Sequence, residues 1–306
     1  MSKAKLSEQL SRVSHYHIGR ILYATDLNTN VDEALEYAVT LALTYDAKLL
    51  VCHCTSETIT DVNAEADRRS FIEHHFTESI GRCVNPGEQP TLQWESIITS
   101  GEVAEAIADQ ARLHKVDLIV MRSRRRPYTA SLLGSTAEKV CRLAPCAVLV
   151  THADEHNLTD NSAGDMNINR ILVACDFSDY SKLAVSYALS LAKAYESELH
   201  LLHVLPANLE HAWAPIFGNP EFEATNRLHD ILMDEVRLSC KVIKEVVTKG
   251  EPYNQILKYA QEHNCDLICI GAHGEGYNSG SIFGTNADQI VRKSSCPVLV
   301  ARTLIE

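Results

Sequence analysis

The residue types best suited to binding a ligand stand in one glycine-rich stretch near the C-terminus. Gly271 and Gly274 open this stretch, and after nine further residues Gly284 is followed by Thr285. Because glycine has no Cβ atom, backbone N–H groups in such a loop can approach phosphate oxygens closely. A helix that begins at Thr285 would add unbonded N–H groups and the positive end of its dipole. The spacing therefore predicts a cradle for the phosphates of a nucleotide.

The same residues also allow a purely structural interpretation. Thr285 and Asp288 have the spacing of an N-terminal capping box, as do Ser135 and Glu138 in the first half of the chain. In a capping box the hydroxyl satisfies N–H groups of its own helix and need not face a ligand. Spacing alone leaves both interpretations open.

The elements that must position this loop occur twice along the chain. RILYATD at 20–26 is repeated as RILVACD at 170–176. GSTAEKVCRLAPCAVLV at 134–150 is repeated as GTNADQIVRKSSCPVLV at 284–300, at the same spacing of 150 residues. Agreement at both ends of each half indicates a tandem duplication of one domain.

A polar stretch between the two copies predicts the domain boundaries. It is rich in Asp, Asn, Ser and Thr, which is typical of a solvated linker. We expect a first domain over 1–151, a linker over 152–168 and a second domain over 169–306.

Each copy is expected to alternate strands with helices. An apolar, β-rich run indicates a buried strand at 170–175, and apolar residues on one helical face predict a helix at 179–195. The other elements expected in the second copy are strands at 199–204, 241–248, 266–271 and 297–301 and helices at 221–239, 252–263 and 285–294. The first copy repeats this order, with strands at 20–25, 48–54, 91–98, 117–121 and 147–151 and helices at 30–46, 61–80, 101–114 and 135–143. The fold class predicted is α/β, with two tandem doubly wound domains, each built on a five-stranded parallel sheet of the Rossmann-like, nucleotide-binding kind.

Composition excludes several classes of protein. The 306 residues carry 28 Lys and Arg against 40 Asp and Glu, a formal net charge of -12. General nucleic-acid binders are usually basic, so we expect no general nucleic-acid binding. No apolar run reaches the ~18 residues of a membrane helix, and the start lacks the apolar core of a secretory signal. Ten cysteines without a CxxC pair suit a reducing compartment, and we expect a cytoplasmic protein.

The histidines and cysteines are not expected to bind a metal ion. Cys52 and Cys54 share one face of a predicted strand and His53 takes the other, so the three side chains cannot easily converge. His53 recurs as His203 in the second copy, again within a strand. We therefore interpret both histidines as satisfied core residues.

Several runs of the second copy together closely resemble the universal stress protein family. They are RILVACDFSDYSKLAVSYALSLAKAY, LHLLHV, DLICIGAHG with a Gly-Thr pair nine residues later, and CPVLVAR. The resemblance spans nearly all of both halves and looks like a tandem two-domain member. The family's glycine motif, G-x2-G-x9-G-[S/T], is intact in the second copy. The resemblance implies a role in stress response and the binding of ATP, or of ADP or AMP, with or without Mg²⁺.

The resemblance also implies roles for the matching positions. Asp176 is expected to reach the adenosine part, and Ala174 and Cys175 to line the same pocket. Val204 is expected to contact the adenine through its backbone, and Ile270 to flank the base or ribose. The residues expected around the phosphates are Gly271, His273, Gly274, Gly284, Thr285 and Asn286. From residue chemistry alone, Asp176 could instead be a turn or cap residue, and His273 could simply face solvent.

The matching loop of the first copy, RSRRRPYTASLLGS, departs from the motif. Arg122 and Arg125 stand where the first two glycines would be, although Gly134 and Ser135 remain. One interpretation is a degenerate pocket that is kept for folding and pairing. The other is that guanidinium groups bind a different anion there, from Arg122, Arg124, Arg125 and Arg126.

Three functions follow for the whole chain. The first is a binding module whose conformation or partners respond to an adenine nucleotide. The second is a slow ATP hydrolase or phosphotransferase; near the loop the sequence offers only Asp176, Glu275 and Asp288 as carboxylates, and no Walker A motif. The third is an interaction scaffold without a ligand. The resemblance further implies that the two copies pair through their last strands, and two chains could then associate as a homodimer.

Overall fold

The computed structural model describes residues 17–27, 33–55, 62–82, 92–123, 135–152, 168–207, 219–232, 242–274 and 284–302. These residues divide into two compact units, one described from 17 to 152 and the other from 168 to 302. Most of the predicted linker lies outside the described residues.

The first unit alternates strands and helices along its length. Its elements are β1 (Arg20–Thr25), α2 (Glu33–Tyr45), β2 (Lys48–Thr55), α3 (Val62–Arg82), β3 (Trp94–Ser100), α4 (Val103–Leu113), β4 (Leu118–Ser123), α5 (Ser135–Leu143) and β5 (Ala147–His152). Its strands lie in the order β3-β2-β1-β4-β5, and the described pairs are all parallel.

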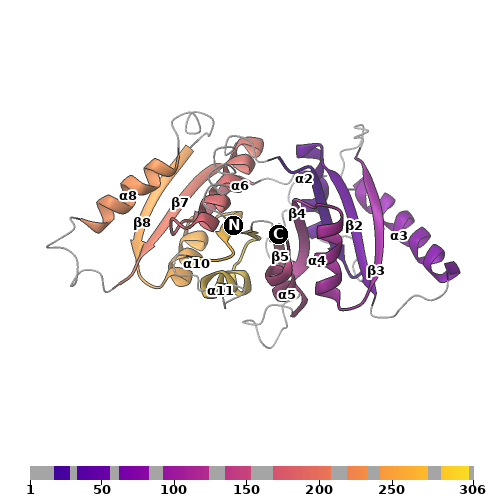
Figure 1. Ribbon diagram of the computed structural model, residues 1–306. Helices are drawn as coiled ribbons and strands as arrows, with labels where there is room; N and C mark the ends of the chain where they lie inside the picture. The colour runs from indigo at the N-terminus through magenta and orange to yellow at the C-terminus, as the bar shows by residue number, and fades with distance from the viewer. Residues whose placement is uncertain are drawn as a thin grey trace. The chain divides into compact units, whose positions relative to one another are not determined.

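The second unit repeats this arrangement. Its elements are β6 (Arg170–Ala174), α6 (Asp179–Tyr195), β7 (Glu198–Leu205), α8 (Pro220–Ile231), β8 (Val242–Lys249), α10 (Pro252–Glu262), β9 (Leu267–Gly271), α11 (Thr285–Lys293) and β10 (Val298–Ala301). The strand order is β8-β7-β6-β9-β10, again with parallel pairs. Figure 1 shows helices packed against the sheet within each half. The predicted α/β fold with doubly wound parallel sheets is confirmed.

The core of each unit explains why these sequences form these elements. Ile171, Leu172 and Val173 of β6 are each 0% exposed, as expected for a central parallel strand that is covered on both faces. The helix that follows β6 turns an alanine-rich stripe with Tyr187 toward the sheet. Small residues in that stripe let the helix backbone lie close to the strands. The first unit carries the matching stripe on α2, which includes Tyr37.

The duplication extends to polar contacts at the amino ends of the strands. Oδ2 of Asp117 accepts hydrogen bonds from the backbone N–H groups of Gly19 and Arg20, both at 2.9 Å. Oδ2 of Asp266 accepts from Asn169 at 2.8 Å and Arg170 at 2.9 Å. Each aspartate therefore satisfies the chain where it enters the first strand of its own unit.

One predicted element ends earlier than expected. A helix was predicted over 221–239, but α8 ends at Ile231, and Leu232 has extended backbone angles (φ −98°, ψ 106°). Residues 233–239 of that prediction lie outside the described residues. Among the helices that the structure describes, none has the length and apolarity needed to cross a membrane.

Candidate functional site

The predicted site residues of the second unit gather at the carboxyl ends of β6 and β9. These strands are neighbours at the point where the strand order reverses, which is where open α/β sheets bind ligands. Asp176 follows β6, and Gly271 ends β9. A Cβ atom placed on Gly274 would lie 2.5 Å from Oδ2 of Asp176, so the glycine loop and the carboxylate are in direct proximity.

Asp176 also has a structural role at the start of α6. Its Oδ1 accepts hydrogen bonds from the backbone N–H and the hydroxyl of Ser178, at 3.1 and 2.5 Å. Ser178 is the N-cap of α6, and its Oγ accepts from the N–H of Ser181 at 3.2 Å. The turn interpretation of Asp176 therefore holds for Oδ1, while Oδ2 lies on the side of Gly274.

Gly271 is required for close packing. A Cβ atom here would lie 2.8 Å from the carbonyl carbon of Tyr180 and 2.9 Å from the backbone nitrogen of Ser181. The end of β9 thus lies directly against the first turn of α6. This contact brings the amino end of α6 beside residues 271–273, because Gly271 has no side chain to hold it away.

The two ends of the glycine loop are closed on each other. The N–H of Gly284 donates to the carbonyl of Ala272 at 2.9 Å. A Cβ atom on Gly284 would lie 3.1 Å from that same carbonyl oxygen, closer than most real contacts. The hydrogen bond therefore joins the end of β9 to the start of α11, and residues 275–283 between them lie outside the described residues.

The capping-box interpretation of Thr285 is wrong. Gly284 is the N-cap of α11, with φ −68° and ψ 139°, and Thr285 is the first helical residue. Asp288 is bound elsewhere, since its Oδ2 accepts from Nε of Arg292 at 2.7 Å. Because a glycine cap has no side chain, it cannot satisfy the first N–H groups of α11. Thr285 and Asn286 are exposed beside these groups.

His273 is buried and not in solvent. It is 4% exposed, and its ring packs edge-on against Tyr180 with 5.1 Å between ring centroids. Burial lowers the pKa of His273, and the positive charge of Arg302 lowers it further. The alternative that His273 faces solvent is therefore wrong. Its imidazole packs beneath the start of the glycine loop, against α6. Its backbone carbonyl oxygen is 3.5 Å from the hydroxyl of Ser178.

The strand end that carries Ala174 and Cys175 is tied to β7 by a histidine. Nδ1 of His203 lies 2.7 Å from the carbonyl oxygen of Cys175. In the first unit, Nδ1 of His53 lies 3.1 Å from the carbonyl of Thr25 in the same way. Both histidines are hydrogen-bonded as predicted, but both are half-buried and so are not core residues. Within the described ranges, no group of three His, Cys, Asp or Glu side chains could hold a metal ion.

An aromatic stack beside Asp176 was missed by the sequence argument. Phe177 has a φ of 68°, and its ring lies 4.4 Å from the ring of His203. The guanidinium of Arg227, on α8, lies 3.8 Å from the centroid of the Phe177 ring. Ser178 could have been found, because a serine just before an apolar-periodic run signals an N-cap. Arg227 offered no such signal, since its position depends on how α8 packs.

The remaining predicted site residues lie on the strands or directly after them. Val204, near the end of β7, is half-buried and pairs with Thr248 of β8. Ile270 of β9 is 3% exposed and pairs with Val300. Cys175 is 3% exposed, and burial raises the pKa of its thiol, so it is a neutral lining group.

In the first unit the corresponding strand end carries Arg122 on β4 in place of Gly271. Arg122 is half-buried and pairs with Thr151 of β5. The other three arginines of the anion hypothesis, Arg124, Arg125 and Arg126, lie outside the described residues. That hypothesis stays a prediction.

Comparison with known proteins agrees with this geometry. The model of the universal stress protein family matches twice, at residues 17–152 and 167–302. A universal stress protein of Mycolicibacterium smegmatis is 24% identical over 297 residues, which cover 92% of this chain and 96% of that protein. A universal stress protein of Methanocaldococcus jannaschii is 24% identical over 150 residues, covering 45% of this chain and 85% of that protein.

A solved structure shares the whole fold. The crystal structure of a universal stress protein from Archaeoglobus fulgidus has a TM-score of 0.70 at 21% identity. The match covers 94% of this chain and 99% of the other. The chain belongs to the universal stress protein family, as a tandem member with two copies of the family domain.

Proposed function

We propose that the second domain binds an adenine nucleotide, ATP in the first place, and that the bound nucleotide sets the protein's conformation or its partners in a stress response. The observation that carries the proposal is the contact between the glycine loop and Asp176. The Cβ position of Gly274 is 2.5 Å from Oδ2 of Asp176, so only a residue without a side chain lets the loop lie this close to the carboxylate that is proposed to bind the ligand.

The amino end of α11 supports an assignment for the phosphate end of the proposed ligand. Its first N–H groups have no capping side chain from Gly284, and Thr285 and Asn286 stand exposed next to them. An anion at a helix amino terminus gains from both the N–H groups and the dipole. The amino end of α6, by contrast, is already capped by Ser178. We therefore assign the phosphates to α11 and the loop that precedes it.

We assign the nucleoside end of the proposed ligand to the ends of β6 and β7. A carboxylate such as that of Asp176 accepts hydrogen bonds from ribose hydroxyls. The backbone of Val204 is the proposed contact for adenine, with Ala174, Cys175 and Ile270 as apolar lining. This assignment rests on the family resemblance together with the proximity of Asp176 to Gly274.

The described carboxylates favour binding over turnover. Asp288 forms an ion pair with Arg292, and one oxygen of Asp176 is held by Ser178. Efficient phosphoryl transfer needs carboxylates that hold metal ions and a residue that positions the nucleophile. Mg²⁺ would then be bound chiefly through the nucleotide's own phosphates, because it keeps several waters and needs few protein ligands.

The identity of the ligand decides the proposal. Protein purified without added nucleotide is denatured, and the released small molecules are identified by mass spectrometry. Calorimetry with ATP, ADP and AMP then measures affinity, with and without Mg²⁺. An adenine nucleotide that is released and rebinds supports the proposal. If none is released and none binds, the interaction-scaffold alternative replaces it. Steady phosphate release with Mg²⁺ that Asp176→Ala abolishes would instead favour the hydrolase.

We further propose that the two domains pair within one chain through their last strands, that two chains associate as a homodimer, and that the protein works in the cytoplasm. Such apolar end strands need cover against other chains. The family resemblance supports the pairing. A charged substitution such as Val298→Asp is expected to weaken this pairing, and small-angle X-ray scattering of the variant against the unaltered chain measures whether the two domains separate. Light scattering measures the assembly mass and so tests the homodimer.

A further inference from the structure

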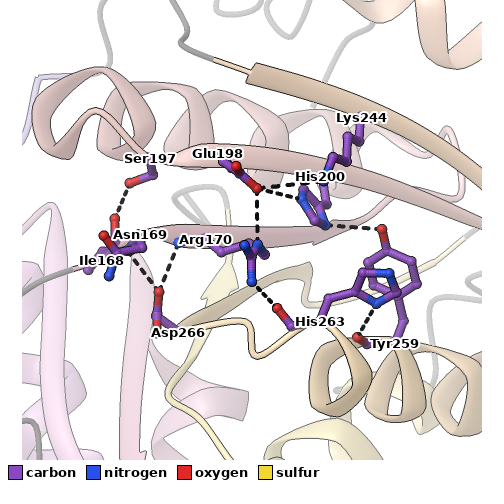
Figure 2. Close-up of polar contacts among 10 residues, drawn as sticks. All are labelled: Ile168, Asn169, Arg170, Ser197, Glu198, His200, Lys244, Tyr259, His263 and Asp266. Atoms are coloured by element: carbon purple, nitrogen blue, oxygen red, sulfur yellow. Dashed lines mark hydrogen bonds and ion pairs between the residues drawn. The ribbon is translucent and has the colours of Figure 1, made fainter.

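A buried histidine lies at the opposite edge of the second sheet from the glycine loop. His200 is the third residue of β7, near the amino ends of the strands, and its side chain is 0% exposed. Figure 2 shows its ring between the Tyr259 hydroxyl and the Glu198 carboxylate. Nδ1 lies 3.0 Å from the hydroxyl of Tyr259, and Nε2 lies 3.5 Å from Oε2 of Glu198.

The last turn of α10 covers this histidine. Tyr259 and His263 are stacked on each other with ring centroids 3.9 Å apart and an interplanar angle of 15°. Both meet His200 edge-on, at 5.7 and 5.9 Å. The carbonyl of His263 also accepts a hydrogen bond from Arg170. Tyr259 and His263 therefore shield one side of the His200 imidazole from water, and this shielding is lost if this end of α10 moves away from the sheet.

The charges around His200 oppose its protonation. Oε2 of Glu198 lies 3.1 Å from Nε of Arg170 and 3.7 Å from Nζ of Lys244, so two permanent cations already share this carboxylate. A charged imidazole would be a third cation on the same group. Burial lowers the pKa of His200 to about 4, and Lys244 and Arg170 also lower it, whereas Glu198 acts to raise it.

Three further groups near His200 lie on or just after α10, and none of them adds a negative charge that would stabilise a protonated imidazole. Asp266 uses Oδ2 to accept from the backbone N–H groups of Asn169 and Arg170. Burial raises the pKa of Cys265 to about 12, so its thiol stays neutral. The Tyr259 hydroxyl also stays protonated, since burial raises its pKa.

The first domain lacks this arrangement at the equivalent place. Leu50 pairs with Leu22 of β1 as His200 pairs with Leu172 of β6, so a leucine occupies the position of the histidine. The carbonyl of His114 accepts from Arg20 just as that of His263 accepts from Arg170. Counting back four residues from His114 gives Gln110 where the second domain has a tyrosine. The buried imidazole is thus particular to the second domain.

We propose that His200 is a proton-operated latch between β7 and the last turn of α10, closed while the imidazole is neutral and opened by proton uptake. This device is independent of nucleotide binding. In the closed state Nδ1 accepts the Tyr259 hydroxyl, and no charge is buried. When the last turn of α10 unwinds from the sheet, its amides lose their hydrogen bonds, and the imidazole meets water and takes up a proton at its ordinary pKa.

The linkage between proton binding to His200 and the opening of α10 gives the direction and size of the pH dependence. Because the pKa of His200 is lower when α10 is closed, the contribution of His200 to closure is fully present above about pH 6.5 and is lost as pH falls toward about 4. Between pH 7 and pH 5 the opening equilibrium is expected to rise by about twentyfold. Below about pH 4 no further change is expected, since both states are then protonated.

Hydrogen exchange of the full chain tests the latch with an internal control. Amide exchange of α10 and of α4 is followed at pH 7 and pH 5 and corrected for the intrinsic pH dependence of exchange. We expect the corrected rate to rise by about twentyfold in the last turn of α10, residues 259–262, and to stay within about twofold in the last turn of α4, residues 110–113. An equal rise in both helices would overturn the proposal.

Two further measurements separate the latch from general acid sensitivity. His200→Leu copies the first domain and is expected to abolish the pH dependence of exchange in α10, whereas Tyr259→Phe is expected to keep it. An undiminished pH dependence in His200→Leu would overturn the proposal. If that variant does not fold, NMR titration of His200 in the unaltered chain decides. An apparent pKa below about 5 supports the latch, and one above about 6 excludes it.

Discussion

Gly274 and Asp176 come so close that a Cβ atom on the glycine would lie 2.5 Å from the carboxylate oxygen Oδ2. The two residues leave different strands, β9 and β6, and meet at the switch point of the sheet. Asp176 cannot simply turn away, because its other oxygen holds the hydroxyl and N–H of Ser178. Any side chain at position 274 must therefore displace the loop or the carboxylate.

Gly274→Ala is accordingly expected to weaken nucleotide binding by about tenfold or more, which corresponds to about 1.4 kcal/mol. Calorimetry with ATP measures the loss. Gly81→Ala is the matched control, because a Cβ atom at that glycine meets nothing within 4 Å. Unchanged affinity in Gly274→Ala would mean that nucleotide binding does not depend on this close approach of the loop to Asp176.

Most of the fold could be predicted because the same pattern of motifs occurs in both halves of the sequence. Agreement between 20–26 and 170–176 and between 134–150 and 284–300 indicated two copies of one domain, and the alternation of strands and helices predicted a parallel sheet in each, although the order of its strands comes from the structure. Local sequence was less informative about helix termini. The capping-box spacing of Thr285 was misleading, since Gly284 takes the cap position.

Contacts that depend on strand register could not be predicted. His200 meets Tyr259 and Glu198 only because β7, β8 and α10 are aligned as they are, and no spacing along the chain encodes that alignment. The same holds for Arg227 over Phe177, which joins α8 to the strand end. By contrast, the role of His203 followed from its repetition as His53.

Gly271→Ala is expected to act on stability. Its new methyl would lie 2.8 Å from backbone and side-chain carbons of Tyr180, where α6 begins. Overpacking of this kind costs about 1–3 kcal/mol in the free energy of unfolding. Urea denaturation of Gly271→Ala and Gly274→Ala measures the free energy of unfolding of each variant. Equal stability of Gly271→Ala and the unaltered chain would show that α6 can shift to make room.

Histidines 53 and 203 offer a matched pair of substitutions. Each ring binds the carbonyl at the end of the first strand in its unit, Thr25 or Cys175. Replacement by leucine leaves that carbonyl without its bond, and each variant is expected to lose about 1–2 kcal/mol of stability. Because Cys175 precedes Asp176, only His203→Leu is expected to weaken ATP binding as well. Equal weakening by His53→Leu would place a nucleotide in the first domain.

Thr285→Ala and Ser178→Ala separate a ligand contact from a helix cap. Thr285 is exposed at the first position of α11, where alanine is well tolerated, so its loss is expected to change the free energy of unfolding by less than about 0.5 kcal/mol. Its hydroxyl is placed to donate to phosphate, and ATP affinity is expected to fall by about threefold to tenfold. Ser178 instead accepts from the N–H of Ser181, and its removal is expected to cost about 1 kcal/mol of stability. Calorimetry and urea denaturation of both variants decide, because a stability loss in Thr285→Ala without weaker binding would restore the purely structural role.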